Sequence, residues 1–91
     1  MSSVYKLQFH RKAKDSLAKL VNSDRPLALQ IKSALNQIQE DPYIGIPLTG
    51  AWKGYYKYRV RDYRIVYELK NEQIIVYVLR ISHRRDVYKE I

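Results

Sequence analysis

The sequence has no cysteine and only two histidines, His10 and His83, which stand far apart along the chain. These absences argue against a disulfide-stapled scaffold and against a zinc site, so we expect neither a metal nor a cofactor. No apolar run approaches the roughly 20 residues of a membrane-spanning helix, and the first residues lack the basic-then-apolar order of a signal peptide. We therefore expect a soluble, cytoplasmic protein with no membrane partner.

Acidic residues are also scarce. Seventeen Lys and Arg stand against nine Asp and Glu, which gives a formal net charge of +8. The excess is concentrated in residues 53–64 and again in residues 80–89. A positive surface of this kind attracts polyanions, and the nine tyrosines offer faces on which bases can stack. We therefore predict a nucleic-acid partner. The alternatives are a basic domain kept soluble by its charge and one that docks an acidic protein.

The first half of the chain predicts a strand and two helices. Residues 4–9 suggest a short strand, and apolar residues then recur at helical spacing over about 10–21. Ser23 or Asp24 can cap a second helix, Pro26 suits its first turn, and Asp41 and Pro42 stop it. The two helices are expected to form a hairpin.

The second half predicts a loop and three strands. All three glycines lie in residues 43–54, which we expect to form a loop that packs Ile46, Leu48 and Trp52 against the sheet edge. Residues 56–61 and 63–69 alternate as strands do, and residues 74–81 are apolar almost throughout, as in a central strand. The fold class is therefore α+β: one domain over residues 1–91, ordered βααβββ, with a mainly antiparallel sheet and a short basic C-terminal tail.

A group of basic residues surrounds the turn between the first two of these strands. If Arg61 and Asp62 form a two-residue loop, Arg59 lies directly across from Arg64, and Lys57 lies on the same face. Like charges directly opposite one another on a sheet repel, so this pairing does not stabilise the fold. It predicts a site that receives an anion.

The segments YKYRV, DYRIVYEL and HRRDVY, at residues 56–60, 62–69 and 83–88, resemble the RelE/ParE superfamily of bacterial toxins from type II toxin-antitoxin modules. The resemblance covers nearly the whole chain. It is closer to the RelE branch, whose members cut mRNA in the ribosomal A site, than to the ParE branch, which inhibits DNA gyrase. It implies a RelE-like fold, a ribosome and mRNA as partners, and a cognate antitoxin, with oligomers formed only through the antitoxin complex.

The resemblance also implies a catalytic set. Lys57 and Arg59 match two basic residues on one strand, although the family usually has lysine at the second, and Arg64 matches the arginine that opens the next strand. Arg84 matches a tail arginine, with Arg85 as the alternative, and Tyr88 matches a tyrosine that stacks on the substrate base.

These residue types suit the chemistry of RNA cleavage without a metal. A lysine accepts the 2′-hydroxyl proton when like-charged neighbours disfavour its protonated form, and guanidinium groups stabilise the phosphorane. Our hypothesis is that Lys57 is the general base and that Arg59 and Arg64 stabilise the transition state. Arg84 or His83 then supplies the proton to the departing oxygen, and Tyr88 orients the RNA base by stacking on it. Further contacts with RNA or the ribosome are predicted at Lys53, Arg61, Arg80, His83 and Arg85.

Simpler interpretations stand beside these. Lys57 is alternatively a solvated strand residue, and His83 a structural hydrogen-bonding group. A mechanism with a glutamate and histidine pair ranks second, because no carboxylate precedes Lys57 on its strand. Trp52 is expected to be structural. Four tyrosines are expected to pack in the core or at an edge, because alternation puts most of them opposite the basic face: Tyr56, Tyr58, Tyr67 and Tyr77. A gyrase inhibitor and a non-catalytic RNA-binding module remain alternative functions.

Overall fold

The computed structural model describes residues 5–86, which form two helices and one five-stranded sheet. The strand β1 (Lys6–Phe9) leads into the helices α1 (Arg11–Ser23) and α2 (Arg25–Glu40). The strands β2 (Ile46–Pro47), β3 (Tyr55–Val60), β4 (Tyr63–Lys70) and β5 (Ile75–His83) follow, with short 3₁₀ turns η1 (Pro42–Ile44), η2 (Gly50–Trp52) and η3 (Asn71–Gln73) between them. The predicted α+β fold is confirmed. The start of the first predicted strand, at residue 4, lies outside the described residues.

Side-chain caps fix where the helices begin. His10 Nδ1 accepts a hydrogen bond from the Lys12 backbone N–H at the start of α1. At the start of α2, Asp24 Oδ1 accepts from the Leu27 N–H at 3.2 Å, and Pro26 lies in the first turn, so Asp24 rather than Ser23 is the cap. A single residue therefore separates the two helices and forces the hairpin.

The strands are ordered β1-β5-β4-β3-β2, and only the β1–β5 pair is parallel. The apolar β5 lies between β1 and β4, as predicted for a central strand. The loop prediction for residues 43–54 missed β2, which adds an edge strand to β3. The prediction that Ile46 packs against the sheet edge was also wrong, because its side chain is 61% exposed. Leu48 and Trp52 are half-buried.

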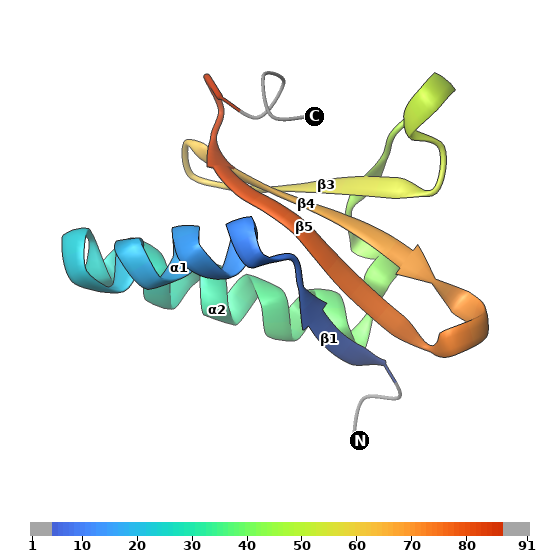
Figure 1. Cartoon of the computed structure of the whole chain (residues 1–91), viewed down its shortest axis with the longest axis horizontal. Coiled ribbons are helices and arrows are strands. Elements are labelled where there is room, and N and C mark those ends of the chain that lie inside the picture. Colours follow the sequence, from blue (N-terminus) through green and yellow to red (C-terminus); the bar gives the residue numbers. More distant parts are fainter. Residues whose placement is uncertain (1–4, 87–91) are drawn as a thin grey trace.

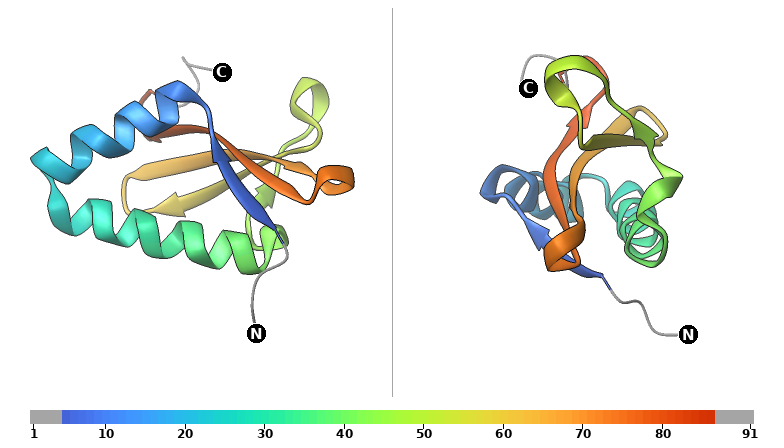
Figure 2. Two further views of the ribbon diagram at one scale, coloured as in Figure 1. Left: turned by 60° about the horizontal axis from the view of Figure 1, so that its bottom comes forward. Right: turned by 90° about the vertical axis from the view of Figure 1, so that its right-hand side faces the viewer.

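Both helices pack on one face of the sheet, and no helix within residues 5–86 covers the other face (Figure 1). Between the two layers lies the core, in which Ile31 and Ile38 of α2 meet Ile65 and Tyr67 of β4 and Val78 of β5. In the two further views η2 extends away from both helices (Figure 2). No helix within residues 5–86 is long and apolar enough to cross a membrane.

The hydroxyl of Tyr67 fixes the loop between α2 and β2. It donates to the Pro42 carbonyl at 2.6 Å and accepts from the Gly45 N–H at 3.2 Å, and the Tyr67 side chain is fully buried. Burial raises the pKa of Tyr67 to about 12. The hydrogen bond from the Gly45 N–H lowers this pKa by a smaller amount, and Asp41 and neighbouring tyrosines raise it further. The loop so anchored places Ile46 beside Lys57 in the β2–β3 ladder.

Candidate functional site

The turn between β3 and β4 has the predicted register. Val60 pairs with Tyr63 and Arg59 with Arg64 across a loop of Arg61 and Asp62. Arg61 has a φ of 55°, in the left-handed region that the first position of such hairpin turns requires. The cross-strand pair of like charges is therefore a property of the fold, with Cβ atoms about 5 Å apart in pairs of this kind.

Lys57 shares a face with this pair, because side chains two residues apart on a strand point to the same side. It pairs with the buried Val66, and both lie on the face opposite the helices. Arg59 is exposed, and its Nε donates to the Arg61 carbonyl at 3.1 Å, whereas the half-buried Arg64 donates from Nη1 to the Tyr63 carbonyl at 3.2 Å. Each of these bonds uses only one of the five N–H groups of a guanidinium, so both arginines keep donors for an anion.

The basic tail meets the same turn. The Arg84 backbone N–H donates to the Asp62 carbonyl at 2.7 Å, so two clusters more than twenty residues apart in sequence lie side by side. Arg84 and Arg85 are both exposed. Tyr88, the last residue of the predicted catalytic set, lies outside the described residues.

A bulge in β5 decides which residues of this strand join the basic face. Val66 pairs with Arg80 and Tyr67 with Val78, which leaves Leu79 as an extra residue. Arg80 is thereby placed on the face of Lys57, where its Nη1 donates to the Leu79 carbonyl at 2.7 Å and lies 3.4 Å from His10 Nδ1. Arg80 thus extends toward the β1 edge, away from the Arg59–Arg64 pair.

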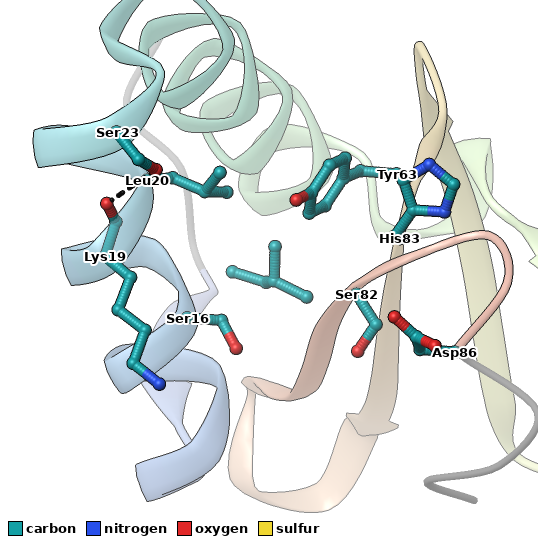
Figure 3. A pocket seen from close by; sticks show the side chains of 9 residues that line it. Ser16, Lys19, Leu20, Ser23, Tyr63, Ser82, His83 and Asp86 are labelled. Carbon is teal, nitrogen blue, oxygen red and sulfur yellow. Dashed lines mark hydrogen bonds between the residues drawn. The ribbon is translucent and has the colours of Figure 1, made fainter.

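His83 lies on the opposite face. It pairs with Tyr63, two residues from the buried Ile65–Ile81 pair, and its Nδ1 accepts from the Arg85 N–H at 3.2 Å. Its ring lines a cavity of about 230 Å³ between α1 and the sheet, shown in Figure 3 with Ser16 and Lys19 on one wall and Tyr63 and His83 on the other. The geometry therefore does not bring His83 together with Lys57, Arg59 and Arg64.

Two aromatic residues, Tyr55 and Tyr77, share the face of the basic residues. Tyr55 lies two residues before Lys57 on the same side of β3 and pairs with Glu68, which in turn pairs with Tyr77. Tyr77 therefore lies on the basic face, whereas Tyr56, Tyr58 and Tyr67 pack toward the core, so most of the four tyrosines lie opposite the basic face as expected. Alternation along β3 was a signal that could have identified Tyr55. Lys53, which is exposed, lies next to it in the turn that precedes β3.

Comparison with known proteins gives the family. The family described as the ParE toxin of the type II toxin-antitoxin system parDE matches residues 7–88. This chain belongs to the RelE/ParE superfamily of type II toxins. Among curated proteins, this RelE/ParE toxin is 31% identical to Toxin RelG of Mycobacterium tuberculosis over 86 residues, which cover 93% of this chain and 97% of RelG.

Solved structures of Rel toxins share the fold. The toxin-antitoxin complex RelBE2 of M. tuberculosis contains a chain that is 31% identical, with a TM-score of 0.72 over 88% of this chain and 98% of that one. The isolated E. coli RelE toxin is 30% identical, with a TM-score of 0.76 over 94% of this chain and 93% of RelE. The matching family thus carries the name of ParE, whereas these relatives at 30% identity or more carry the name of Rel toxins.

Proposed function

We propose that this RelE/ParE toxin is a ribosome-dependent endoribonuclease that cleaves mRNA in the A site and so inhibits translation. The observation that carries the proposal is the cross-strand pair of Arg59 and Arg64 beside Lys57 on the open face of the sheet, with the Arg84 backbone joined to the adjoining turn. Four basic residues held together at one end of a sheet are suited to a phosphate that gains charge during reaction.

The proposed reaction forms a 2′,3′-cyclic phosphate. Lys57 Nζ takes the proton of the 2′-hydroxyl, whose oxygen attacks the adjacent phosphorus, and Arg59 and Arg64 stabilise the phosphorane. The bond to the 5′-oxygen then breaks, and Arg84 supplies the proton that the departing oxygen needs. Arg84 is favoured over His83 because the side chain of His83 lies on the other face of the sheet. Tyr88 keeps its proposed role of stacking on the substrate base.

The ribosome is proposed to supply the in-line geometry. The predicted set contains no strong general base such as a histidine pair, so free RNA should be bound in a salt-sensitive way but cut poorly. Lys53, Arg61 and Arg85, which are exposed, are proposed to contact RNA or the ribosome, and Arg80 to support them from the β1 side. Action on ribosomes places the protein in the cytoplasm.

A cognate antitoxin is the proposed protein partner. The solved relatives include the toxin-antitoxin complex RelBE2 of M. tuberculosis and the intact RelBE complex of E. coli. A net charge of +8 suits an acidic or amphipathic segment laid across the toxin. We propose that higher oligomers form only through this complex.

The test is cleavage of mRNA on ribosomes that hold a defined codon in the A site. Purified toxin should produce a fragment that ends in a 2′,3′-cyclic phosphate. Arg64→Ala should lower the single-turnover rate about 10²-fold or more, the loss expected from one preorganised donor, and Lys57→Ala should act similarly. Lys32→Ala, which removes an exposed charge on α2, is the matched control and should cleave like the parent.

The same assay separates the remaining roles. Arg84→Ala should slow cleavage more than His83→Ala does, and Tyr88→Phe should be milder than Tyr88→Ala if stacking is the role of the ring. Cleavage at the parent rate by both Lys57→Ala and Arg64→Ala would place the site elsewhere. RNA binding without any cleavage would leave a non-catalytic RNA-binding module.

Inhibition of DNA gyrase is the second candidate, and the match to the ParE family favours it. A gyrase inhibitor has no need of Lys57 together with the Arg59–Arg64 pair. Adding the protein to a gyrase supercoiling assay discriminates the two functions, because a nuclease of the proposed kind should leave supercoiling unchanged.

A further inference from the structure

An aromatic group adjoins the basic residues on the open face of the sheet. The ring of Tyr55 meets that of Trp52 edge to face, with centroids 5.7 Å apart and planes at 86°. Both side chains are half-buried, so each keeps exposed surface, and such a contact covers at most one face of a ring. Tyr55 precedes Lys57 by two strand positions, a distance of about 7 Å.

A cavity of about 490 Å³ opens beside Tyr55. Residues 47–50 and 53–56 line it, and they include the exposed Lys53. In Figure 1 the η2 turn, which carries Trp52, rises on the side of the sheet away from the helices. A single strand of RNA lying across the open face from the Arg59–Arg64 pair would therefore reach Tyr55 after Lys57.

We propose that Trp52, Lys53 and Tyr55 form a second nucleotide subsite, which stacks the base of a nucleotide that flanks the scissile phosphate. The assignment rests on the proposed role of Lys57, Arg59 and Arg64 in holding that phosphate. Stacking on aromatic rings tolerates any base, because every base has a π face, so the subsite adds affinity and register rather than a sequence code.

The charges around Tyr55 favour a base over a phosphate at this position. The carboxylate of Glu68 lies across the strand from Tyr55, where it repels a phosphate and can accept a hydrogen bond from an exocyclic amine. On the other side of Glu68, Lys70 Nζ lies 5.0 Å from the centre of the Tyr77 ring. Burial, and then Glu68 and Tyr77, raise the pKa of Tyr55, so its ring stays neutral at physiological pH. Lys53 is left to contact the phosphate of the stacked nucleotide.

Trp52 is the only tryptophan of the chain, so its fluorescence reports on this subsite alone. The probe is a short 2′-O-methyl RNA hexamer, which the proposed chemistry cannot cut, beside a hexamer of the same backbone without bases. Titration with the first should quench Trp52 in a saturable way, and the abasic hexamer should leave the emission nearly unchanged. Equal quenching by both would overturn the proposal, because the phosphates alone would then account for it.

Substitutions separate stacking from packing. Tyr55→Ala should weaken binding of the hexamer about tenfold, whereas Tyr55→Phe should bind like the parent. Tyr55→Leu keeps an apolar side chain without a π face and should bind as weakly as Tyr55→Ala; parent-like binding by a folded Tyr55→Leu protein would overturn the proposal. Tyr55→Ala should leave the salt dependence unchanged, whereas Lys53→Ala should lower the slope of log affinity against log salt by about 1.

The outcome is independent of the cleavage assay. If ribosome-bound mRNA stays intact while base-dependent quenching and the loss in Tyr55→Leu are observed, the proposed cleavage fails and the subsite stands as an RNA-binding site. If the parent cleaves and neither effect is observed, the subsite alone is wrong.

Discussion

Removing the hydroxyl of Tyr67 tests how the fold holds the loop from Pro42 to Gly45, which leads into β2 beside Lys57. In Tyr67→Phe the Pro42 carbonyl loses a donor at 2.6 Å and the Gly45 N–H loses an acceptor at 3.2 Å, and both residues are buried. A buried polar group left without a partner costs about 1–3 kcal/mol, and the variant recovers part of this because it no longer buries a hydroxyl. We expect a net loss of about 2 kcal/mol in the free energy of unfolding.

Urea denaturation followed by far-ultraviolet circular dichroism measures this loss. For a chain of this size a loss of about 2 kcal/mol moves the midpoint by about 1 M urea at unchanged slope. Tyr58→Phe is the matched control, because its hydroxyl donates to Gln37 Oε1 at an exposed position, where water replaces the bond. If Tyr67→Phe and Tyr58→Phe unfold at the same urea concentration as the parent, the loop from Pro42 to Gly45 is not held by this hydroxyl.

Three further predictions follow from the same structure. Gly45→Ala should destabilise by about 1–3 kcal/mol in urea denaturation, because a Cβ there would overlap the Tyr67 hydroxyl and approach the Lys57 carbonyl to 3.1 Å; a neutral result would refute the crowding. Asp24→Ala removes the cap of α2 and should cost about 1 kcal/mol, whereas Asp15→Ala, which removes an exposed acid within α1, should cost much less in the same assay. The pKa of Tyr67 is raised from 10.0 to about 12 in the folded protein, so its stabilising effect is complete below pH 10 and is lost as the pH rises to about 12. The parent should therefore lose more stability over this range than Tyr67→Phe does. Urea denaturation midpoints measured at each pH check this.

The sequence by itself determined the elements whose signals are local. Helix caps, the proline at the start of α2 and the apolar stripes act within a few residues, so both helices were predicted close to their observed bounds. The two-residue turn at Arg61 and Asp62 likewise fixed the register of its own hairpin. The Arg59–Arg64 pair, the central part of the candidate site, could therefore be predicted from spacing alone.

Tertiary structure decided what depends on partners far along the chain. β2 exists because its backbone pairs with β3, and its two residues, one of them a proline, are too few to show the alternation of a strand. The Tyr67 hydroxyl forms hydrogen bonds with Pro42 and Gly45, which are more than twenty residues away in the sequence. The Arg84 N–H and the Asp62 carbonyl are also more than twenty residues apart. Such pairings follow from packing of the whole sheet, which no short segment encodes.

The bulge at Leu79 shows why the face of a residue could not be read from alternation. Unbroken alternation from the buried Val76 and Val78 would turn Arg80 toward the helices and His83 away from them. One extra residue reverses both, so Arg80 joins the face of Lys57 and His83 lines the cavity beside α1. The sequence determined which residue types the site has at hand. The pairing of β4 with β5 decided which of them meet, because a shift of one residue moves every later side chain to the other face.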